Sequence, residues 1–465
     1  MQVSLPGLAV CAFLLVSAYC SRGMLIIGLV ASLAFGATAA MTLTSLGGSS
    51  PLIYTVFAAL LVTAVAARRR IWFDLGGVFG SIRPVWILTS LMAYAVIGAL
   101  LFPRFFAGQT SVFVPSKRGA VVEASLAPVS GNISQTGYFV LGGLTAVALC
   151  ALLLHSNRID QVRRGFFLWC ILHIAMGVTD FLGKNAGAGD VLLPIKTASY
   201  AMITGAVEAG FSRITGAFSE ASSFGSVSVA CLAFSYTYWR KTKSRWAQGL
   251  AAILFFLTIL STSSTAYVAL AILCVPVGLS IAASVFKGRV ESDEILIAAL
   301  MAVAGVAIMG ISLFNSGMLE PFVRLIESTI IDKAGSTSGL ERAYWNLKSV
   351  QAFFDTSGLG IGFGSSRASS WPIAVLSQLG LLGSLMMAIL LGVLVRGLGN
   401  LRAWVDPETD AVVAGVRNAG LASILANSLA GGSADPGILF FIALAVVSAT
   451  RVRARRSRER YEKWS

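Results

Sequence analysis

Charged residues, histidines and cysteines are all scarce in this chain, and each shortage excludes a class of protein. Charged residues occupy only 12% of the 465 positions, whereas hydrophobic residues occupy 56% and the mean hydropathy is +0.80. Charged residues make up about a quarter of an ordinary soluble domain, so the composition excludes that class and indicates a polytopic membrane protein.

Histidine and cysteine are too few and too scattered for a metal centre. The two histidines are His155, at the end of an apolar segment, and His173, within one, where a packing role is the ordinary expectation. Neither a zinc or iron site built from several histidines nor a cofactor is therefore expected. The cysteines lie inside or at the ends of apolar segments, which predicts no disulfide framework and no CxxC metal site. They are Cys11, Cys20, Cys150, Cys170, Cys231 and Cys274.

Long apolar runs dominate the chain. A helix needs about twenty apolar residues to span a bilayer, and hydropathy marks roughly thirteen such stretches, or twelve if one of the weaker ones fails. They lie near residues 4–20, 24–41, 51–67, 84–102, 137–155, 165–182, 221–239, 246–262, 265–286, 294–314, 372–395, 416–431 and 437–450. The sequence therefore predicts an all-α bundle of transmembrane helices, forming a single integral membrane domain over residues 1–465.

Lysine and arginine concentrate in alternate connections between the predicted spans. These basic connections hold Arg68, Arg69, Arg70 and Arg83; Arg158, Arg163 and Arg164; Arg240, Lys241, Lys243 and Arg245; Lys287 and Arg289; Arg396 and Arg402; and a tail from Arg451 to Lys463. Because basic loops stay in the cytoplasm, the pattern predicts a cytoplasmic C-terminus with a basic tail over residues 451–465. It also puts the whole formal charge of +14 on one face, beside anionic lipid headgroups, so no nucleic-acid partner is expected.

Three long segments on the opposite side, near residues 103–136, 183–220 and 315–371, are where function is expected to concentrate. The first is expected to form a partly ordered cover, and the second has apolar residues spaced like those of an interfacial helix. The third and longest predicts a small helical cap on the periplasmic side, with amphipathic helices over Leu319–Ile331 and Gly339–Phe354. No periodicity suggests a strand-rich domain.

The run R-I-T-G-A-F-S-E-A-S-S-F-G places Arg213 and Glu220 immediately before an apolar helix. The two residues are seven apart, so they share a face if the run is helical, or approach across a turn if Gly216 breaks it. A guanidinium stays charged and offers a fixed fork of donors, which suits the oxygens of a phosphate or diphosphate. The alternative is a structural ion pair that holds a re-entrant loop. The functional interpretation is favoured because charges near a bilayer usually line a polar cavity.

A second cluster lies in the run G-L-E-R-A-Y-W-N, where Arg342 is followed by Tyr344 and Trp345. Aromatic faces stack on sugar rings while a guanidinium binds the anion, so these residues predict a site for a sugar phosphate, although Tyr and Trp also anchor proteins at membrane interfaces. Arg367, after a glycine-rich stretch, and Arg324, on the polar face of the first cap helix, are further candidate ligands. The glycines match neither a P-loop nor a dinucleotide-binding motif.

Other polar residues near the outer helix ends have weaker signals. Asp180, Lys184, Glu208 and Asp435 each line the cavity or are merely solvated at the surface. The run S-T-S-S-T at 261–265 predicts a polar tight turn at the outer face, whose hydroxyls could contact a sugar.

Taken together, these motifs resemble the Wzy-type polysaccharide polymerase and O-antigen ligase superfamily. The resemblance rests on R-x-x-G-x-F-x-E-x-S-x-F at Arg213–Phe224, E-R-x-x-W-N at Glu341–Asn346 and G-L-G-I-G-F-G at Gly358–Gly364. It implies a membrane glycosyltransferase with the GT-C type of fold in the bacterial inner membrane. Such enzymes transfer a glycan from an undecaprenyl diphosphate carrier to an acceptor hydroxyl at the periplasmic face.

The resemblance also implies roles for residues and partners. Arg213 and Arg342 are the expected ligands of the diphosphate, and Glu220, the acid of the first motif, is the first choice for the base, with Glu341 the second. Ligases usually place a His after the glycine-rich stretch, where this chain has Ser-Ser-Trp at 369–371, so a polymerase of lipid-linked repeat units is favoured over a ligase. A flippase or other transporter of lipid-linked oligosaccharide is the third alternative. Expected partners are the undecaprenyl diphosphate-linked oligosaccharide, membrane lipid, a chain-length regulator and a flippase; no metal or nucleotide-sugar cofactor is implied.

Overall fold

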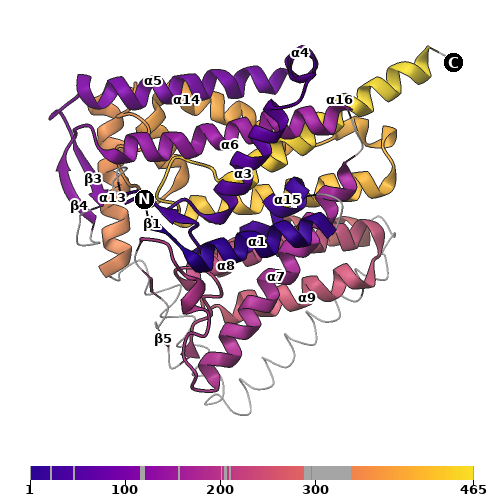
Figure 1. The fold of residues 1–465 in the computed structure, drawn as a ribbon, viewed down its shortest axis with the longest axis horizontal. Coiled ribbons are helices and arrows are strands. Elements are labelled where there is room, and N and C mark those ends of the chain that lie inside the picture. The colour runs from indigo at the N-terminus through magenta and orange to yellow at the C-terminus, as the bar shows by residue number, and fades with distance from the viewer. Residues whose placement is uncertain are drawn as a thin grey trace.

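The structure is a computed structural model that describes residues 2–20, 24–44, 48–115, 121–155, 158–200, 202–203, 207–208, 211–286, 295 and 337–463. Helices dominate these residues (Figure 1). The α-helices are α1 (Leu5–Cys20), α2 (Met24–Ala31), α3 (Ile53–Ala66), α4 (Ile71–Ser81), α5 (Arg83–Phe105), α6 (Ser130–His155), α7 (Ile159–Asn185), α8 (Ala221–Thr242), α9 (Arg245–Leu260), α10 (Ser264–Phe286), α13 (Thr337–Asp355), α14 (Trp371–Arg396), α15 (Pro407–Ala430) and α16 (Ile438–Glu462).

Short 3-10 helices and strands occupy several of the connections. The 3-10 helices are η1 (Ser32–Ala34), η3 (Leu193–Ile195) and η5 (Gly399–Trp404). The strands form antiparallel pairs, β1 (Gln2–Val3) with β2 (Met41–Thr42), β3 (Ser111–Pro115) with β4 (Val121–Ser125), and β5 (Val207–Glu208) with β6 (Phe211–Ser212).

Within the described chain, 6 helices are long and apolar enough to cross a membrane, namely α5, α6, α7, α10, α14 and α15. The shorter apolar helices are Leu5–Cys20, Leu25–Ala34, Ile53–Ala66 and Arg245–Leu260. The helical content and these apolar helices confirm the prediction of a mostly helical, multi-pass membrane protein. The predicted span at 294–314 lies outside the described residues except for its second position, and each of the other predicted spans has a helix at its place.

Most of the long helices lie side by side, so their ends gather at two opposite ends of the bundle (Figure 1). The end that carries α4, the α8–α9 connection and the C-terminus is called the basic end here, because the arginine and lysine clusters lie in these segments. The other end, called the loop end, carries β1, the β3–β4 pair and α13. A continuous apolar core, which includes Phe57, Phe139, Phe166, Phe234 and Phe441, fills the space between the helices.

Ion pairs fasten the helices to one another at the basic end. Arg163 of α7 pairs with Glu408 at the start of α15, and Lys241 of α8 pairs with Asp410 two residues further on. The guanidinium of Arg402 in η5 also lies 3.3 Å from the Asp410 carboxylate. Three parts of the bundle, α7, α8 and η5, therefore meet on the acidic first turn of α15.

The basic tail predicted after residue 450 is not a separate segment. Instead α16 continues through it as far as Glu462. Arg456 of this extension donates a hydrogen bond of 2.7 Å to Ser81 Oγ at the end of α4, and Tyr461 packs its ring against Trp404 at 5.4 Å. The helical tail is thus attached to the basic end of the bundle.

The predicted span at 24–41 is broken near its middle. α2 ends at Ala31, one 3-10 turn follows, and residues 35–43 and 48–52 are not helical. Gly36 lies where a Cβ would approach the Phe218 ring to 2.1 Å, so the backbone passes too close for a side chain. Ala37 donates to Ala217 O at 2.9 Å and Ala198 donates to Ala37 O at 3.0 Å. Distant loop segments therefore replace the helical hydrogen bonds.

The three long segments of the loop end differ in structure. The segment 103–136, predicted as a partly ordered cover, holds the β3–β4 pair. In the described parts of 186–220 there is a 3-10 turn and the β5–β6 pair rather than an interfacial helix. The helix predicted over Gly339–Phe354 is present as α13, which begins at Thr337. The helix predicted over Leu319–Ile331, and with it Arg324, lies outside the described residues.

Candidate functional site

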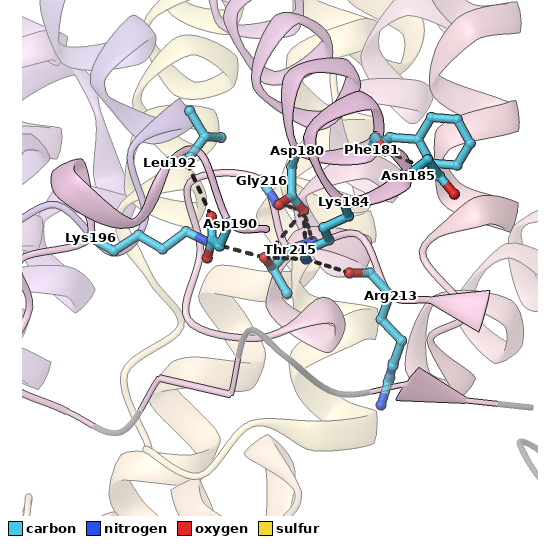
Figure 2. A network of polar contacts seen from close by, with 10 residues as sticks. All are labelled: Asp180, Phe181, Lys184, Asn185, Asp190, Leu192, Lys196, Arg213, Thr215 and Gly216. Carbon is cyan, nitrogen blue, oxygen red and sulfur yellow. Dashed lines mark hydrogen bonds and ion pairs between the residues drawn. The ribbon is translucent and has the colours of Figure 1, made fainter. Parts of the chain in front are cut away.

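A buried ionic network lies at the loop end of α7 (Figure 2). Asp180 is completely buried, and its Oδ2 accepts hydrogen bonds from the backbone N–H groups of Thr215 at 2.7 Å and Gly216 at 3.1 Å. Lys184, one turn further along α7, donates from Nζ to the same oxygen at 3.0 Å and to the carbonyl of Arg213 at 2.7 Å. Oδ2 of this buried carboxylate is therefore satisfied by several donors and a cation, whereas Oδ1 is buried without a hydrogen-bond partner among the described residues.

A second ion pair extends this network. Lys196 donates to Asp190 Oδ2 at 2.7 Å and to Thr215 Oγ1 at 3.0 Å, and its side chain is fully buried. Burial lowers the pKa of Lys196, while the hydrogen bond and charge of Asp190 act in the opposite direction. Asp180, Lys184 and Lys196 thus all bond to Thr215, and Asp190 joins the network through Lys196.

The network fixes the backbone that carries Arg213 and leaves the arginine side chain directed elsewhere. In Figure 2 the Arg213 side chain points away from Asp180 and Lys184, and only its carbonyl oxygen takes part in the network. Ile214 packs with Phe224 in a small buried cluster, and Gly216 has a positive φ of 51° with the Phe224 ring 2.8 Å from its Cβ position. A glycine is therefore required at the turn that aims Arg213.

Glu220 directly precedes α8 and does not pair with Arg213 among the described ion pairs. Its backbone is extended, with φ −154° and ψ 161°, and its Oε1 accepts hydrogen bonds from the hydroxyls of Ser222 at 2.5 Å and Ser223 at 3.4 Å. Residues 213–220 are not helical, so of the two geometries considered the shared helical face does not occur. The structural ion pair that the described residues show beside this loop joins Asp180 and Lys184.

The turn predicted at 261–265 packs beside the first turn of α8. α9 ends at Leu260 and α10 begins at Ser264, and Ser261 and Ser263 are fully buried. A Cβ on Gly225 would lie 3.1 Å from Ser261 Oγ. The charge of Arg213 also acts on Tyr267 in the first turn of α10, so this turn and Arg213 are neighbours.

One face of α13 meets the segment that follows the glycine-rich stretch. The Arg367 guanidinium lies 5.5 Å from the centre of the Trp345 ring, a cation–π contact, and the Ser369 N–H donates to Asn346 Oδ1 at 2.9 Å. Arg342 precedes Trp345 by three residues and Asn346 by four, so it lies on the same face of α13. The structure therefore brings together Arg367 and Trp345 and places Arg342 one turn away.

Two other candidates in α13 face elsewhere. Tyr344 donates to Glu123 Oε2 on β4 at 2.9 Å and packs edge-on against Phe113 on β3. This hydrogen bond raises the pKa of Tyr344 and lowers that of Glu123. Tyr344 thus attaches α13 to the β3–β4 pair. Glu341 is exposed and has no ion-pair or hydrogen-bond partner in the described part of the chain.

The glycine-rich stretch is a packed structural segment. Gly358, Gly360, Gly362 and Gly364 all have a positive φ, and a Cβ on Gly364 would lie 2.3 Å from the carbonyl of Gly131 on α6. The N–H groups of Gly362 and Gly364 donate to the backbone and side-chain oxygens of Gln378 on α14. These donors are already used inside the protein, which agrees with the interpretation that the stretch is no phosphate-binding loop.

Asp435 lies in the connection between α15 and α16, close to the candidate residues around Arg367. Its Oδ1 accepts from the Gly437 N–H at 2.8 Å, and burial raises its pKa to about 6 although this hydrogen bond opposes the shift. In the same connection, Gly432 accepts a hydrogen bond from Ala368 at 3.1 Å, and a Cβ there would lie 2.9 Å from Arg367 Nε. Asp435 is therefore near the Arg367 side of the loop end.

Two tyrosines, Tyr54 and Tyr200, lie between Asp435 and Glu220. Asp435 and Tyr200 both lie near Tyr54 of α3. Partial burial and the neighbouring carboxylate of Glu220 raise the pKa of Tyr200 to about 12, and its hydroxyl donates to Gly36 O at 2.6 Å. Sequence reasoning missed Tyr54 and Tyr200, because nothing in their local sequence distinguishes them from tyrosines that anchor a membrane interface.

The remaining candidates have ordinary positions. His173 is buried, stacks on Phe224 at 4.4 Å and shares a 2.7 Å hydrogen bond with Ser228 Oγ, as expected of a packing residue. Glu208 lies in β5. Among the described residues, no group of three or more His, Cys, Asp and Glu side chains comes together as a metal site.

A scan against protein families finds no match to this chain, and a search of curated proteins finds no similar sequence. The family resemblance and the function therefore depend on the residues and on their arrangement at the loop end.

Proposed function

We propose that this chain is a polysaccharide polymerase of the bacterial inner membrane with the GT-C type of fold. It transfers a glycan from an undecaprenyl diphosphate carrier to the hydroxyl of another lipid-linked repeat unit. The observation that carries the proposal is the buried Asp180–Lys184 network, which fixes the loop of Arg213 and leaves its guanidinium directed away. Such a preorganised cation suits a substrate that carries a diphosphate.

The charge distribution supports the orientation. Basic connections remain in the cytoplasm, so the basic end is cytoplasmic and the loop end faces the periplasm. β6, which immediately precedes Arg213, and α13, which carries Arg342, both belong to loop-end segments, so both arginines act on the same side of the membrane.

An apolar groove beside the network suits the lipid part of the substrate. It has a volume of about 600 Å³ and is lined by Pro6, Ala9, Val10, Phe13, Phe35, Leu172, Met176 and Ile195. Ile195 directly precedes Lys196 of the ionic network, so an isoprenoid chain in this groove would bring its diphosphate towards the Arg213 loop.

The proposed reaction gives each of these residues a role. The bond between the anomeric carbon and the diphosphate oxygen breaks, and its electron pair leaves with the diphosphate, whose growing charge Arg213 and Arg342 stabilise. The acceptor hydroxyl oxygen bonds to the same carbon and gives its proton to a carboxylate. Glu220 is the first choice for this base. Asp435 replaces Glu341 as the second choice, because a pKa of about 6 is close to the working pH whereas Glu341 is exposed on α13.

The experiment uses purified protein in nanodiscs with undecaprenyl diphosphate-linked repeat units. A polymerase generates a ladder of products, a ligase requires a distinct acceptor, and a transporter forms no new glycosidic bond. We expect Arg213→Gln and Arg342→Gln each to lower the rate by about 100-fold or more, the usual effect of removing one group that stabilises transition-state charge. Arg104→Gln, at the exposed end of α5, is the matched control and should retain the ladder. Ladders of normal rate from both site variants would refute the assignment.

A further inference from the structure

A second cavity lies at the basic end, far from the candidate site. It has a volume of about 460 Å³ and is lined by Arg68, Arg69, Arg70, Phe73, Asp74 and His155. These residues come from the connection between α3 and α4, the start of α4 and the end of α6. Three consecutive arginines therefore border a space large enough for a small anionic group.

The cavity has more positive charge than its single acid neutralises. Asp74 is buried and pairs with Arg68 at 3.0 Å, while His155 Nε2 lies 3.9 Å from its other oxygen. Burial and the neighbouring charge of Arg68 lower the pKa of Arg158, another cation beside this space. Arg69 and Arg70 are exposed and form no ion pair with any described residue. Asp74 holds the wall of the cavity in place, and two guanidinium groups are left to face an anion.

The position of α4 shows what kind of anion is near. In Figure 1 α4 is viewed down its axis whereas α5 and α6 extend across the view, so α4 lies across the direction of the spanning helices. Trp72 and Phe73 in its first turn are 83% and 72% exposed. Large exposed aromatic rings on a short helix across a membrane protein are typical of the interface between lipid and water. The arginines therefore lie at the depth of the lipid headgroups.

We propose that this cavity binds the headgroup phosphate of an anionic glycerophospholipid. The guanidinium groups of Arg69 and Arg70 take the phosphate oxygens, and the rings of Trp72 and Phe73 lie against the glycerol and the first part of the acyl chains. The bound lipid neutralises the clustered arginines where α3, α4 and α6 meet, and so stabilises this corner of the bundle. The inference is independent of the proposed glycan transfer.

The test is lipid binding by the full chain, followed by native mass spectrometry. Wild-type protein and Arg69→Gln/Arg70→Gln are purified from nanodiscs of phosphatidylethanolamine that contain a minor fraction of phosphatidylglycerol, and retained lipids are counted. Arg455→Gln/Arg460→Gln is the matched control, because it removes the same charge from exposed positions on α16. We expect the site variant to bind phosphatidylglycerol about 30-fold more weakly, the usual effect of two basic residues beside an anionic lipid.

Two further measurements make the test decisive. Trp72→Ser should also weaken the binding, although it leaves every charge in place, and inorganic phosphate alone should not displace the lipid. Equal retention by wild type and the Arg69/Arg70 variant would overturn the proposal, and so would an equal loss in the α16 control. Displacement by inorganic phosphate would mean that the cavity takes a free anion and not a lipid.

Discussion

Asp180 offers the sharpest test of how the Arg213 loop is held. Asp180→Asn keeps an oxygen for the N–H groups of Thr215 and Gly216, which now donate to Oδ2 at 2.7 and 3.1 Å. It removes the charge opposite Lys184, whose side chain is only 9% exposed. A buried ion pair that loses one partner usually costs about 3–5 kcal/mol, because the other charge stays buried without compensation. We expect the free energy of unfolding to fall by an amount near the lower end of this range, because Lys184 keeps its contacts with Arg213 O and Thr215 Oγ1.

The assay is denaturant unfolding of the protein in detergent, followed by the glycan ladder. Lys184→Met combined with Asp180→Asn should recover at least about 1 kcal/mol relative to the sum of the two single changes, because the double variant buries no unpaired charge. Asp355→Asn, an exposed aspartate at the end of α13, is the control and should change the stability by less than about 0.5 kcal/mol. Strict additivity of the two changes, or an Asp180→Asn variant as stable as the wild type, would refute the reasoning.

Three further outcomes are expected. Gly364→Ala should sharply reduce the yield of folded protein in size-exclusion chromatography, because the new Cβ meets Gly131 O at 2.3 Å at a φ of 76°, whereas Gly392→Ala, with no atom within 4 Å, should not. Between pH 4 and about 6 the free energy of unfolding should fall as the pH rises, because the carboxyl of Asp435 holds its proton more tightly in the folded protein than in the unfolded chain. The unfolding midpoint of Asp435→Asn should not show this pH-dependent fall. Arg367→Lys, which loses planar stacking on Trp345 but keeps the charge, should raise KM for the lipid-linked substrate a few-fold with little effect on kcat, equivalent to about 0.5–1 kcal/mol of binding.

The membrane helices were largely predictable because a span has a length requirement that composition alone reveals. α5, α6 and α10 all have continuous apolar runs and form single helices. The break in α2 was not predictable, because Gly36 and Ala37 are as apolar as the helix before them. Their hydrogen-bond partners are Ala217, Ala198 and the hydroxyl of Tyr200, more than 150 residues away. Hydropathy has no information about such contacts.

The sequence contains a pattern that indicates the β3–β4 pair. S-V-F-V-P and V-V-E-A-S are both rich in β-branched residues and are separated by a short run that includes Gly119, a pattern typical of a strand pair. In a chain dominated by apolar helices, these few residues look like part of an irregular loop.

Charged candidates could be named from the sequence, but their partners could not. Arg213 and Glu220 lie in the same motif, yet the carboxylate that holds the Arg213 loop is Asp180, on the preceding helix. Asp180 and Lys184 are four residues apart on α7, and this spacing alone would have indicated their pairing. Their contact with the backbone of Thr215 arises only from the tertiary fold, which no local spacing predicts.

The central claim is that Arg213 and Arg342 bind one diphosphate at the loop end. The most direct measurement is a double-mutant cycle on the affinity for undecaprenyl diphosphate, using wild-type protein, Arg213→Gln, Arg342→Gln and the double variant in nanodiscs. Each single change should cost about 1.5–3 kcal/mol of binding, and the two should couple by at least about 0.5 kcal/mol because they share the same ligand group. Losses that simply add, or an affinity unchanged by either substitution, would contradict the account.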